Sequence, residues 1–409
     1  MMRTSTFLLL GASALLAAMP ALLSAGLLNA AVQMLIAALF ASAYGLLAGR
    51  AGMLSFGHAA YFGVGAFATV HAMNALNGAG LLPTPLLPLV GAGAGLAFGV
   101  VAGWFATQRS GTAFAMITLA IAELLHALAP QLKSLFGGES GISAMRMPAW
   151  GLSFGSTTQV YYLTLAWVLA SLALLHFHTR TPAGRLTLGL RENAHRLRFL
   201  GYDVHRLGVS AFAISGLFSG IAGALQVLAN EAANYVVFDA HVSASVVLNS
   251  YIGGVGVFLG PALGAALMSF FGYAVSDATQ AWLLYQGVLF VIVMMFMPEG
   301  LVGLGATARH RVRVLGPARA LPLLAAGMLA VLLLAGGTVF LVELLQRLCS
   351  QDYRALAATA GAWPPVTMFG RSWAAASAAT WAWPAGLLLT GGALMAFART
   401  RLLAREAQR

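Results

Sequence analysis

One pair of side chains has a spacing that could bind a metal or move protons. Glu123 and His126 stand three residues apart in an apolar stretch, so a helix would place them on one face. A carboxylate di-metal site needs a second copy of this Glu-x-x-His pattern, and the sequence holds none. An ionisable group within an apolar span is costly and marks a functional site by default. Two interpretations of Glu123 therefore stay open: a group on a transport path, or a protonated or hydrogen-bonded acid that packs helices.

The sequence lacks the motifs of a nucleotide-binding protein or a covalent enzyme. A P-loop places glycine before its phosphate-binding lysine, but the single lysine, Lys133, follows Leu132. The single cysteine, Cys349, rules out an intrachain disulfide and a multi-cysteine metal site. No acid, base and nucleophile cluster together in the sequence. We therefore predict a protein that is not an enzyme and that has no metal and no cofactor of its own.

The elements that must position these residues are apolar helices. Only 8% of the 409 residues are charged and 60% are hydrophobic, whereas a soluble domain carries about 25% charged residues. Apolar stretches of roughly 17–25 residues separate the charged clusters, which is enough to cross a bilayer core of about 30 Å as helix. Lipid cannot satisfy backbone polar groups, so such segments must be helical or buried in protein. The sequence therefore predicts an all-α, polytopic transmembrane bundle.

We expect about ten spans in a core and two more near the C-terminus. The expected spans are residues 7–28, 31–48, 54–76, 86–107, 112–130, 159–177, 209–230, 243–258, 261–278, 282–298, 320–345 and 376–398. Residues 7–28 also fit a signal peptide with a small-residue cleavage site at 23–25. The uncleaved interpretation is preferred, because cleavage would leave an odd number of spans.

The basic residues predict the orientation of the bundle. Threading the spans from an inside N-terminus places 17 of the 22 lysines and arginines on the inner side and 5 on the outer side. This positive-inside bias predicts that both termini are cytoplasmic. The net charge of +11 is thereby explained by topology and does not indicate nucleic acid binding.

Two spans are interrupted by glycine in a way that is typical of transporters. The breaks cover residues 49–58 and 253–261. Interrupted helices in both halves of a transporter point to the solute path, while small residues also allow close helix packing. The residues assigned to the breaks or to the path are Gly52, Ser55, Gly57, His58, Thr118, Glu123, Gly253, Gly254, Gly256, Gly260 and Pro261. Close helix approach or an unwound backbone is expected at Gly57 and Gly256, and His58 is expected to pack and not to act as a ligand.

Two loops are long enough to carry a function. The inner loop, residues 179–208, holds six arginines, and its residues 185–200 can form an amphipathic helix. Such a helix lies on a lipid surface or docks into a groove of a partner, and composition alone favours the lipid surface. The outer loop, residues 131–159, is rich in glycine and serine, and loops of this length usually carry function or disorder.

Several sequence blocks, taken in order, carry a family resemblance. They read GRAGMLSFGHAAYFGVGAF at 49–67, FAMITLAIAE at 114–123, FGGESGI at 136–142, REN at 191–193, AFAIS at 211–215, GIAGAL at 220–225, IGGVGVFLGP at 252–261 and PEGL at 298–301. Together they resemble the M-type permease subunits of branched-chain amino-acid ABC importers. Each block is weak alone, but the ordered set, which spans residues 30–304, is specific.

The resemblance implies a transmembrane subunit of an importer for a small polar solute, with branched-chain or related amino acids expected. The implied partners are a second permease subunit, two cytoplasmic ATPase subunits that bind ATP, a periplasmic solute-binding protein and the lipid of a bacterial inner membrane. The inner-loop helix then becomes the ATPase-coupling helix, which replaces the lipid-surface interpretation. Its expected contact residues are Arg191, Glu192, Asn193, Arg198, Leu200 and Gly201.

The chain also departs from the family pattern. Arg50 stands where the pattern is usually uncharged, Met53 where glutamine is common, Ala194 where an acid often follows, and Val257 where a small hydroxyl residue is frequent. The pattern ends after Leu304. We therefore expect a permease core at 1–304, a basic cytoplasmic linker at 305–319 and a C-terminal extension with two transmembrane helices at 320–409.

A twelve-span secondary transporter driven by a proton or sodium gradient is the alternative. The number of spans suits it, and Glu123 could relay the proton. Such proteins usually hold more ionisable groups within the membrane, whereas Glu231, Asp239 and Asp277 fall near the ends of the expected spans.

Overall fold

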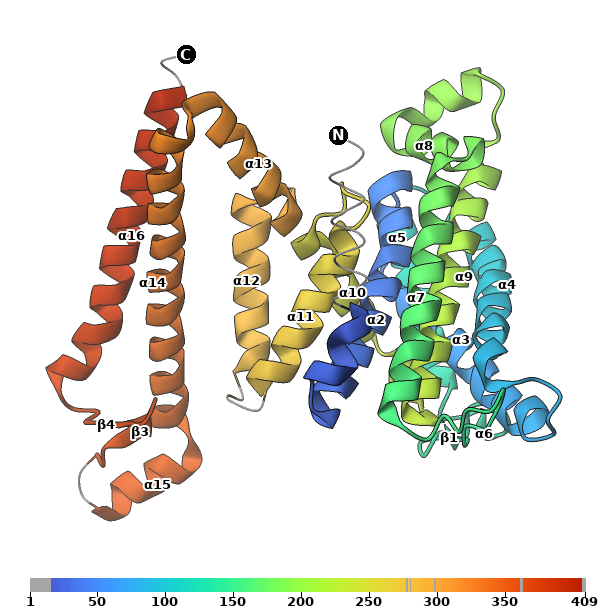
Figure 1. Ribbon diagram of the computed structural model, residues 1–409, viewed down its shortest axis with the longest axis horizontal. Coiled ribbons are helices and arrows are strands. Elements are labelled where there is room, and N and C mark those ends of the chain that lie inside the picture. Colours follow the sequence, from blue (N-terminus) through green and yellow to red (C-terminus); the bar gives the residue numbers. More distant parts are fainter. Residues whose placement is uncertain (1–15, 277–278, 280, 298, 361–362, 407–409) are drawn as a thin grey trace. The chain divides into compact units, whose positions relative to one another are not determined.

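The computed structural model describes residues 16–276, 279, 281–297, 299–360 and 363–406, and its regular structure is mainly helical (Figure 1). The predicted all-α class is confirmed, since the strands are only two or three residues long. The chain forms two compact units. The first comprises residues up to Tyr273 with Val293–Val302, and the second comprises Ala274–Ile292 with Gly303–Arg409. The expected division at residues 304 and 319 stays a prediction.

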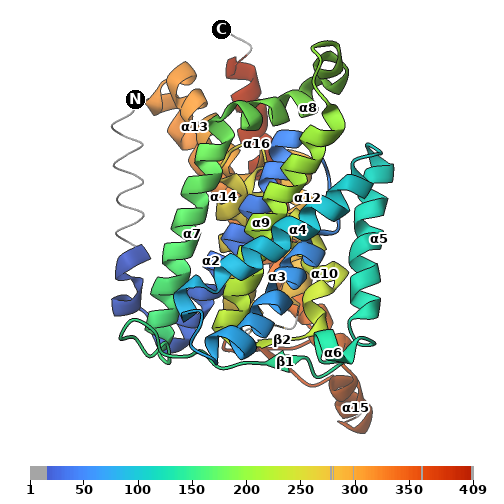
Figure 2. The same ribbon diagram turned by 90° about the vertical axis from the view of Figure 1, so that its right-hand side faces the viewer.

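The first unit is a bundle whose helices are joined by short irregular segments. Its elements are α2 (Ala25–Gly45), the π-helix η1 (Leu46–Ala51), α3 (His58–Ala72), the π-helix η2 (Met73–Asn77), the 3-10 helix η3 (Thr84–Leu86), α4 (Pro88–Ala106), α5 (Thr112–Leu128), α6 (Lys133–Phe136), β1 (Ile142–Ser143), α7 (Thr157–Arg180), α8 (Pro182–Phe199), α9 (Val204–Asn230), β2 (Ala232–Ala233), the 3-10 helix η4 (Tyr235–Phe238), α10 (Ala240–Gly253) and α11 (Gly260–Ser276). α8 lies at one end of this unit, and α6, β1 and β2 lie at the opposite end (Figures 1 and 2).

Glycine lets α4 and α9 pack with their backbones in contact. Gly91 and Gly95 on α4 face Gly216 and Gly220 on α9, and a Cβ added at any of the four would overlap the facing backbone. Without a hydrophobic driving force between helices in lipid, such close approach supplies the packing that holds them. The sequence is apolar on all sides of α9, and the structure buries most of this helix accordingly.

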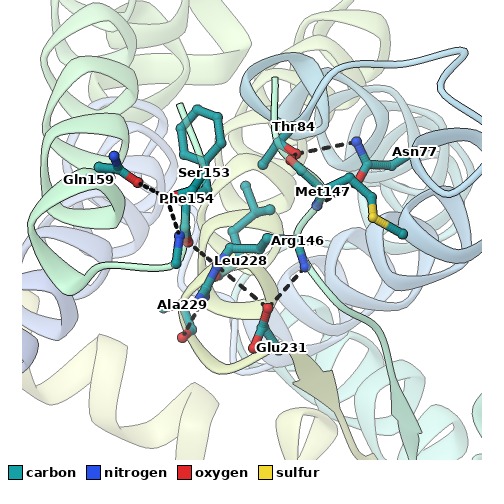
Figure 3. A network of polar contacts seen from close by, with 11 residues as sticks. Asn77, Thr84, Arg146, Met147, Ser153, Phe154, Gln159, Leu228, Ala229 and Glu231 are labelled. Atoms are coloured by element: carbon teal, nitrogen blue, oxygen red, sulfur yellow. Dashed lines mark hydrogen bonds and ion pairs between the residues drawn. The ribbon is translucent and has the colours of Figure 1, made fainter. Parts of the chain in front are cut away.

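A buried arginine fixes the long loop at the end opposite to α8 (Figure 3). Arg146 donates from Nε to the Phe154 carbonyl at 2.8 Å and from Nη1 to the Leu228 carbonyl at 2.5 Å, and its backbone N–H donates to Glu231 Oε1 at 2.9 Å. Leu228 lies in the last turn of α9, where free carbonyls favour a cation. β1 pairs with β2 through Ile142 and Ala233. Arg146 and the β1–β2 pair therefore hold the long loop against the C-terminal end of α9.

The second unit contains two long helices that pack against each other. Its elements are α12 (Trp282–Phe296), α13 (Gly300–Leu315), α14 (Pro317–Cys349), α15 (Gln351–Ala360), β3 (Val366–Met368), β4 (Arg371–Trp373) and α16 (Ala378–Glu406), although the end of α12 and the start of α13 belong to the first unit. Gly337 on α14 approaches Leu388 of α16, and Gly391 on α16 approaches Leu334 of α14. The Tyr285 hydroxyl on α12 donates to Glu343 Oε1 on α14 at 3.1 Å, which partners this nearly buried carboxylate.

Fewer helices are long enough to span a membrane than the sequence predicted. Six helices in the described part of the chain are long and apolar enough, or seven if the bent pair α12 and α13 counts as one span. Expected spans 54–76, 112–130, 243–258 and 261–278 correspond to helices of 14 to 17 residues, α3, α5, α10 and α11. The count of ten plus two is therefore not confirmed. Residues 7–15 of the first expected span lie outside the described residues.

Candidate functional site

The first glycine break is an unwound segment whose backbone is hydrogen-bonded by side chains. Gly52 ends the π-helix η1 with φ 70°, and α3 begins only at His58. The Phe56 N–H donates to Thr118 Oγ1 at 3.1 Å, and the Ala59 N–H donates to Ser243 Oγ at 2.9 Å. Unwound backbone at membrane depth is tolerated only where protein satisfies it. The hydroxyls of α5 and α10 thus replace the missing helical hydrogen bonds.

His58 is fully buried, and both of its ring nitrogens face serine hydroxyls. Nε2 lies 2.9 Å from Ser215 Oγ, and Nδ1 lies 3.1 Å from Ser55 Oγ. The Ser215 hydroxyl donates to the Ala43 carbonyl at 2.7 Å, so it accepts the proton of Nε2–H. Nδ1 then accepts from Ser55, and the ring is neutral. The surrounding rings belong to Phe40, Tyr44, Tyr61 and Phe212. His58, at the start of α3, is therefore linked to α9 by its hydrogen bond with Ser215, and Ser215 is linked in turn to α2.

Removing the Ser215 hydroxyl is expected to destabilise the chain by about 1–3 kcal/mol, because Ser215→Ala leaves a buried His58 N–H unpaired. Ser219, one turn later on α9, is a matched control. Its buried hydroxyl has no hydrogen-bond partner among the described residues, so Ser219→Ala removes no bond. Thermal unfolding of the purified variants measures both effects. If the melting temperature of Ser215→Ala equalled that of Ser219→Ala, the hydrogen bond between His58 and Ser215 would contribute nothing to thermal stability.

The second break is a junction of glycines around residue 254. α10 ends at Gly253 and α11 begins at Gly260, and a Cβ on either glycine would overlap backbone of the other side of the junction. Gly254, with φ 107°, lies against the Glu299 carbonyl, and Gly300 lies against the N–H of Gly254. Gly256 differs, since no atom lies within 4 Å of the position of its Cβ. Of the two expectations for Gly256, close approach is therefore wrong, whereas the residue does lie in non-helical backbone between α10 and α11. Gly253 and Gly260 carry the close approach instead.

The two breaks, about 200 residues apart in sequence, meet each other and α8. A Cβ on Gly49 in η1 would overlap the Val255 carbonyl, and a Cβ on Gly45 would overlap the Pro261 ring. Arg191 on α8 donates from Nη1 to the Gly49 carbonyl at 2.5 Å, and its side chain also packs against Gly52. α8 is therefore connected to the first break directly through Arg191, and to the second break through the contact of Gly49 with Val255.

The inner-loop helix is kinked, and its far half exposes apolar side chains. Asn193 has non-helical φ −163° and ψ 94°, and its Oδ1 accepts from the Arg196 N–H at 2.9 Å as an N-cap of the second half. Phe199 is 91% exposed and Leu200 is 64% exposed, directly before Gly201 with φ 86°. Glu192 and Arg198 are exposed as well. An exposed apolar tip on a basic loop is typical of a docking surface.

Glu123 lies apart from this cluster. It is exposed on α5, on the side away from Thr118, which is buried and contacts the first break. No hydrogen bond or ion pair joins Glu123 to another described residue, and no group of three or more His, Cys, Asp or Glu gathers there as a metal site. His126 packs its ring edge-on against Tyr235. The Glu-x-x-His pair therefore does not form a shared site within the described chain.

Three contributors were missed from the sequence. Ser215 and Ser243 are each one of three serines in an otherwise mainly apolar helix, and only their position opposite the first break distinguishes them from the others. Phe199 lies between two predicted contact residues, Arg198 and Leu200, and the sequence pattern did not show that its side chain is exposed. Asn within a helix is a usable signal for the kink, because its side chain competes for backbone N–H groups.

Comparisons with known proteins agree with this architecture. The family described as "Branched-chain amino acid transport system / permease component" matches residues 26–298. The chain is 27% identical over 310 residues to the high-affinity branched-chain amino acid transport system permease protein LivM of Salmonella typhimurium, covering 70% of this chain and 72% of that protein. LivM of Escherichia coli gives 27% over 309 residues with the same coverage. A probable LivM of Methanocaldococcus jannaschii gives 26% over 213 residues, covering 45% and 58%. No solved structure matches the chain.

Proposed function

Because the chain belongs to the family of branched-chain amino acid transport permeases of the ABC type, we propose that it is the transmembrane subunit of an importer for branched-chain or related small amino acids. The energy would come from separate ATPase subunits. One observation carries this proposal beyond family membership: α8 presents an exposed apolar tip at its C-terminal end, while Arg191 near its middle donates a hydrogen bond to the first glycine break. Such a helix can receive movement from a partner and pass it into the bundle.

The remaining partners follow from the surfaces that the chain leaves free. The exposed face of α5, with Met116, Glu123 and Leu124, is apolar except for one carboxylate. A carboxylate without a partner is costly in lipid, so this face fits a second permease subunit or a solute path between the two subunits. The long loop that Arg146 holds in place lies at the end opposite to α8, and its surface fits contact with a periplasmic solute-binding protein. ATP would be bound by the two ATPase subunits alone.

The proposed site combines the first break, the second break and α8. Gly52, Ser55, Gly57, His58 and Thr118 would shape the solute path or its hinge. Gly253, Gly254, Gly260 and Pro261 would form the moving junction, with Gly256 in its open linker. The excess of basic residues in the expected inner loops supports an orientation with α8 and both termini on the cytoplasmic side of a bacterial inner membrane.

Reconstitution tests this function. We expect uptake of labelled leucine, isoleucine or valine by proteoliposomes that hold the chain with its second permease, ATPase subunits and external binding protein, and only with ATP inside. Omission of the ATPase subunits is the control and should abolish uptake. Uptake by the chain alone under a proton or sodium gradient would contradict the proposal and favour the secondary transporter.

A further inference from the structure

A cavity of about 200 Å³ lies where the first break, α7, α8 and the α10–α11 linker meet. This volume exceeds the ~10–15 Å³ that one water needs by more than tenfold. All of its lining residues belong to the first unit. The cavity is therefore large enough for a small organic ligand, and it lies at the junction where the two breaks meet α8.

Two guanidinium groups line this cavity, and no acidic residue does. Arg50 and Arg191 line it together with Thr179, and none of its lining residues in the described part of the chain is Asp or Glu. Arg50 Nη1 reaches only the Thr179 carbonyl, at 3.5 Å, and Arg191 Nη1 reaches the Gly49 carbonyl. A guanidinium has five N–H donors, so most donors of both arginines stay available within the described chain. Paired guanidinium groups recognise a carboxylate through forked hydrogen bonds.

Most of the remaining side chains of the wall are apolar, among them Leu175, Val257 and Phe258, and Ser42 adds one hydroxyl. A ligand that fills it must therefore carry an anionic head and a short hydrocarbon tail. An α-ammonium group would find no carboxylate partner and would face two cations, so the cavity disfavours an amino acid.

We propose that this cavity binds a small branched monocarboxylate without an α-ammonium group, of the 2-oxo acid class, with its carboxylate between Arg50 and Arg191 and its hydrocarbon tail against Phe258. A bound acid would connect η1, α8 and the α10–α11 linker, which are the elements that the proposed transport cycle moves. The site itself does not depend on the transport function, so direct binding to the purified full-length chain tests it separately.

Calorimetric titration of the detergent-solubilised chain with 4-methyl-2-oxopentanoate is the test. We expect binding at micromolar to millimolar concentration, and at least tenfold weaker binding of leucine, which has the same carbon skeleton with an ammonium group. Arg50→Gln should weaken binding of the acid at least tenfold, and Val257→Trp should abolish it by filling the cavity. Arg109→Gln removes an exposed arginine that does not line the cavity and should leave binding unchanged.

Four outcomes would overturn the proposal. They are no binding of 4-methyl-2-oxopentanoate to the unaltered chain at millimolar concentration, equal binding of leucine, tighter binding of inorganic phosphate, and binding that survives both Arg50→Gln and Val257→Trp. If Arg50→Gln does not fold, Val257→Trp alone tests the proposal. Loss of binding in this variant supports the proposal, and retained binding contradicts it. Uptake assays are not used, so failure of this site and failure of the transport function give different results.

Discussion

A permease that carries Phe199→Ala is expected to purify as a folded membrane protein without its ATPase subunits. Phe199 is 91% exposed, and Leu200 beside it is 64% exposed, at the tip of a loop that holds six arginines. Burial of one such aromatic side chain in a partner's groove contributes about 1.5–3 kcal/mol, and truncation of an interface hot spot costs about 2–4 kcal/mol. The ATPase should therefore bind roughly 30-fold to 1000-fold more weakly.

A second exposed phenylalanine supplies the control for this experiment. Phe177 is 69% exposed on α7, a helix long and apolar enough to span a membrane, so we expect lipid to cover it. Phe177→Ala should retain the ATPase subunits. Co-purification after detergent extraction measures both variants, and elution volume in size-exclusion chromatography shows whether each permease is folded. Normal recovery of ATPase with Phe199→Ala would remove the α8 tip from the proposed coupling contact.

The same part of the structure changes what Arg191 is expected to do. The sequence indicated Arg191 as a docking charge, but its guanidinium donates to the Gly49 carbonyl within its own chain. Sequence patterns report which residue types stand together, and they do not report the direction in which a long side chain points. Glu192, exposed on α8, keeps the docking expectation, whereas Arg191 connects the helix to the first break.

The sequence predicts the membrane class and the two breaks well because both depend on local composition. Apolar runs and glycine clusters are visible in a single window of residues. The number of spans is less predictable, since α3 begins only after the first unwound segment and continues as η2, while α10 ends after 14 residues at the second break. Hydropathy does not register the first unwound segment, because Thr118 and Ser243 from other helices accept hydrogen bonds from its backbone and from the start of α3.

The meeting of the two breaks could not be predicted from the sequence. Gly49 and Val255 are far apart in the chain, and nothing in either local pattern specifies the other as a neighbour. Their contact depends on the packing of α2 against α10 and α11, which is a property of the whole first unit. The failed expectation for Gly256 has the same origin, because four glycines in one short run look equivalent until their neighbours are known.

Enlarging Gly253 is expected to prevent accumulation of a folded permease. A Cβ at this position would overlap the Gly260 carbonyl and approach the Gly264 N–H at 2.8 Å, so both contacts are to backbone that cannot rotate away. Overpacking a tight site costs about 1–3 kcal/mol for a small excess and more for a whole side chain. Gly253→Ala should therefore lower the melting temperature, and Gly253→Leu should abolish the monodisperse peak in size-exclusion chromatography.

Gly256→Leu separates this effect from a general intolerance of the linker. Gly256 lies three residues later in the same loop, and no atom lies within 4 Å of its Cβ position. The leucine can project into open space, so yield and melting temperature should stay close to those of the unaltered chain. Similar losses for both leucine variants would mean that the linker as a whole demands glycine, and that the close approach of α10 to α11 at Gly253 is not what holds the junction.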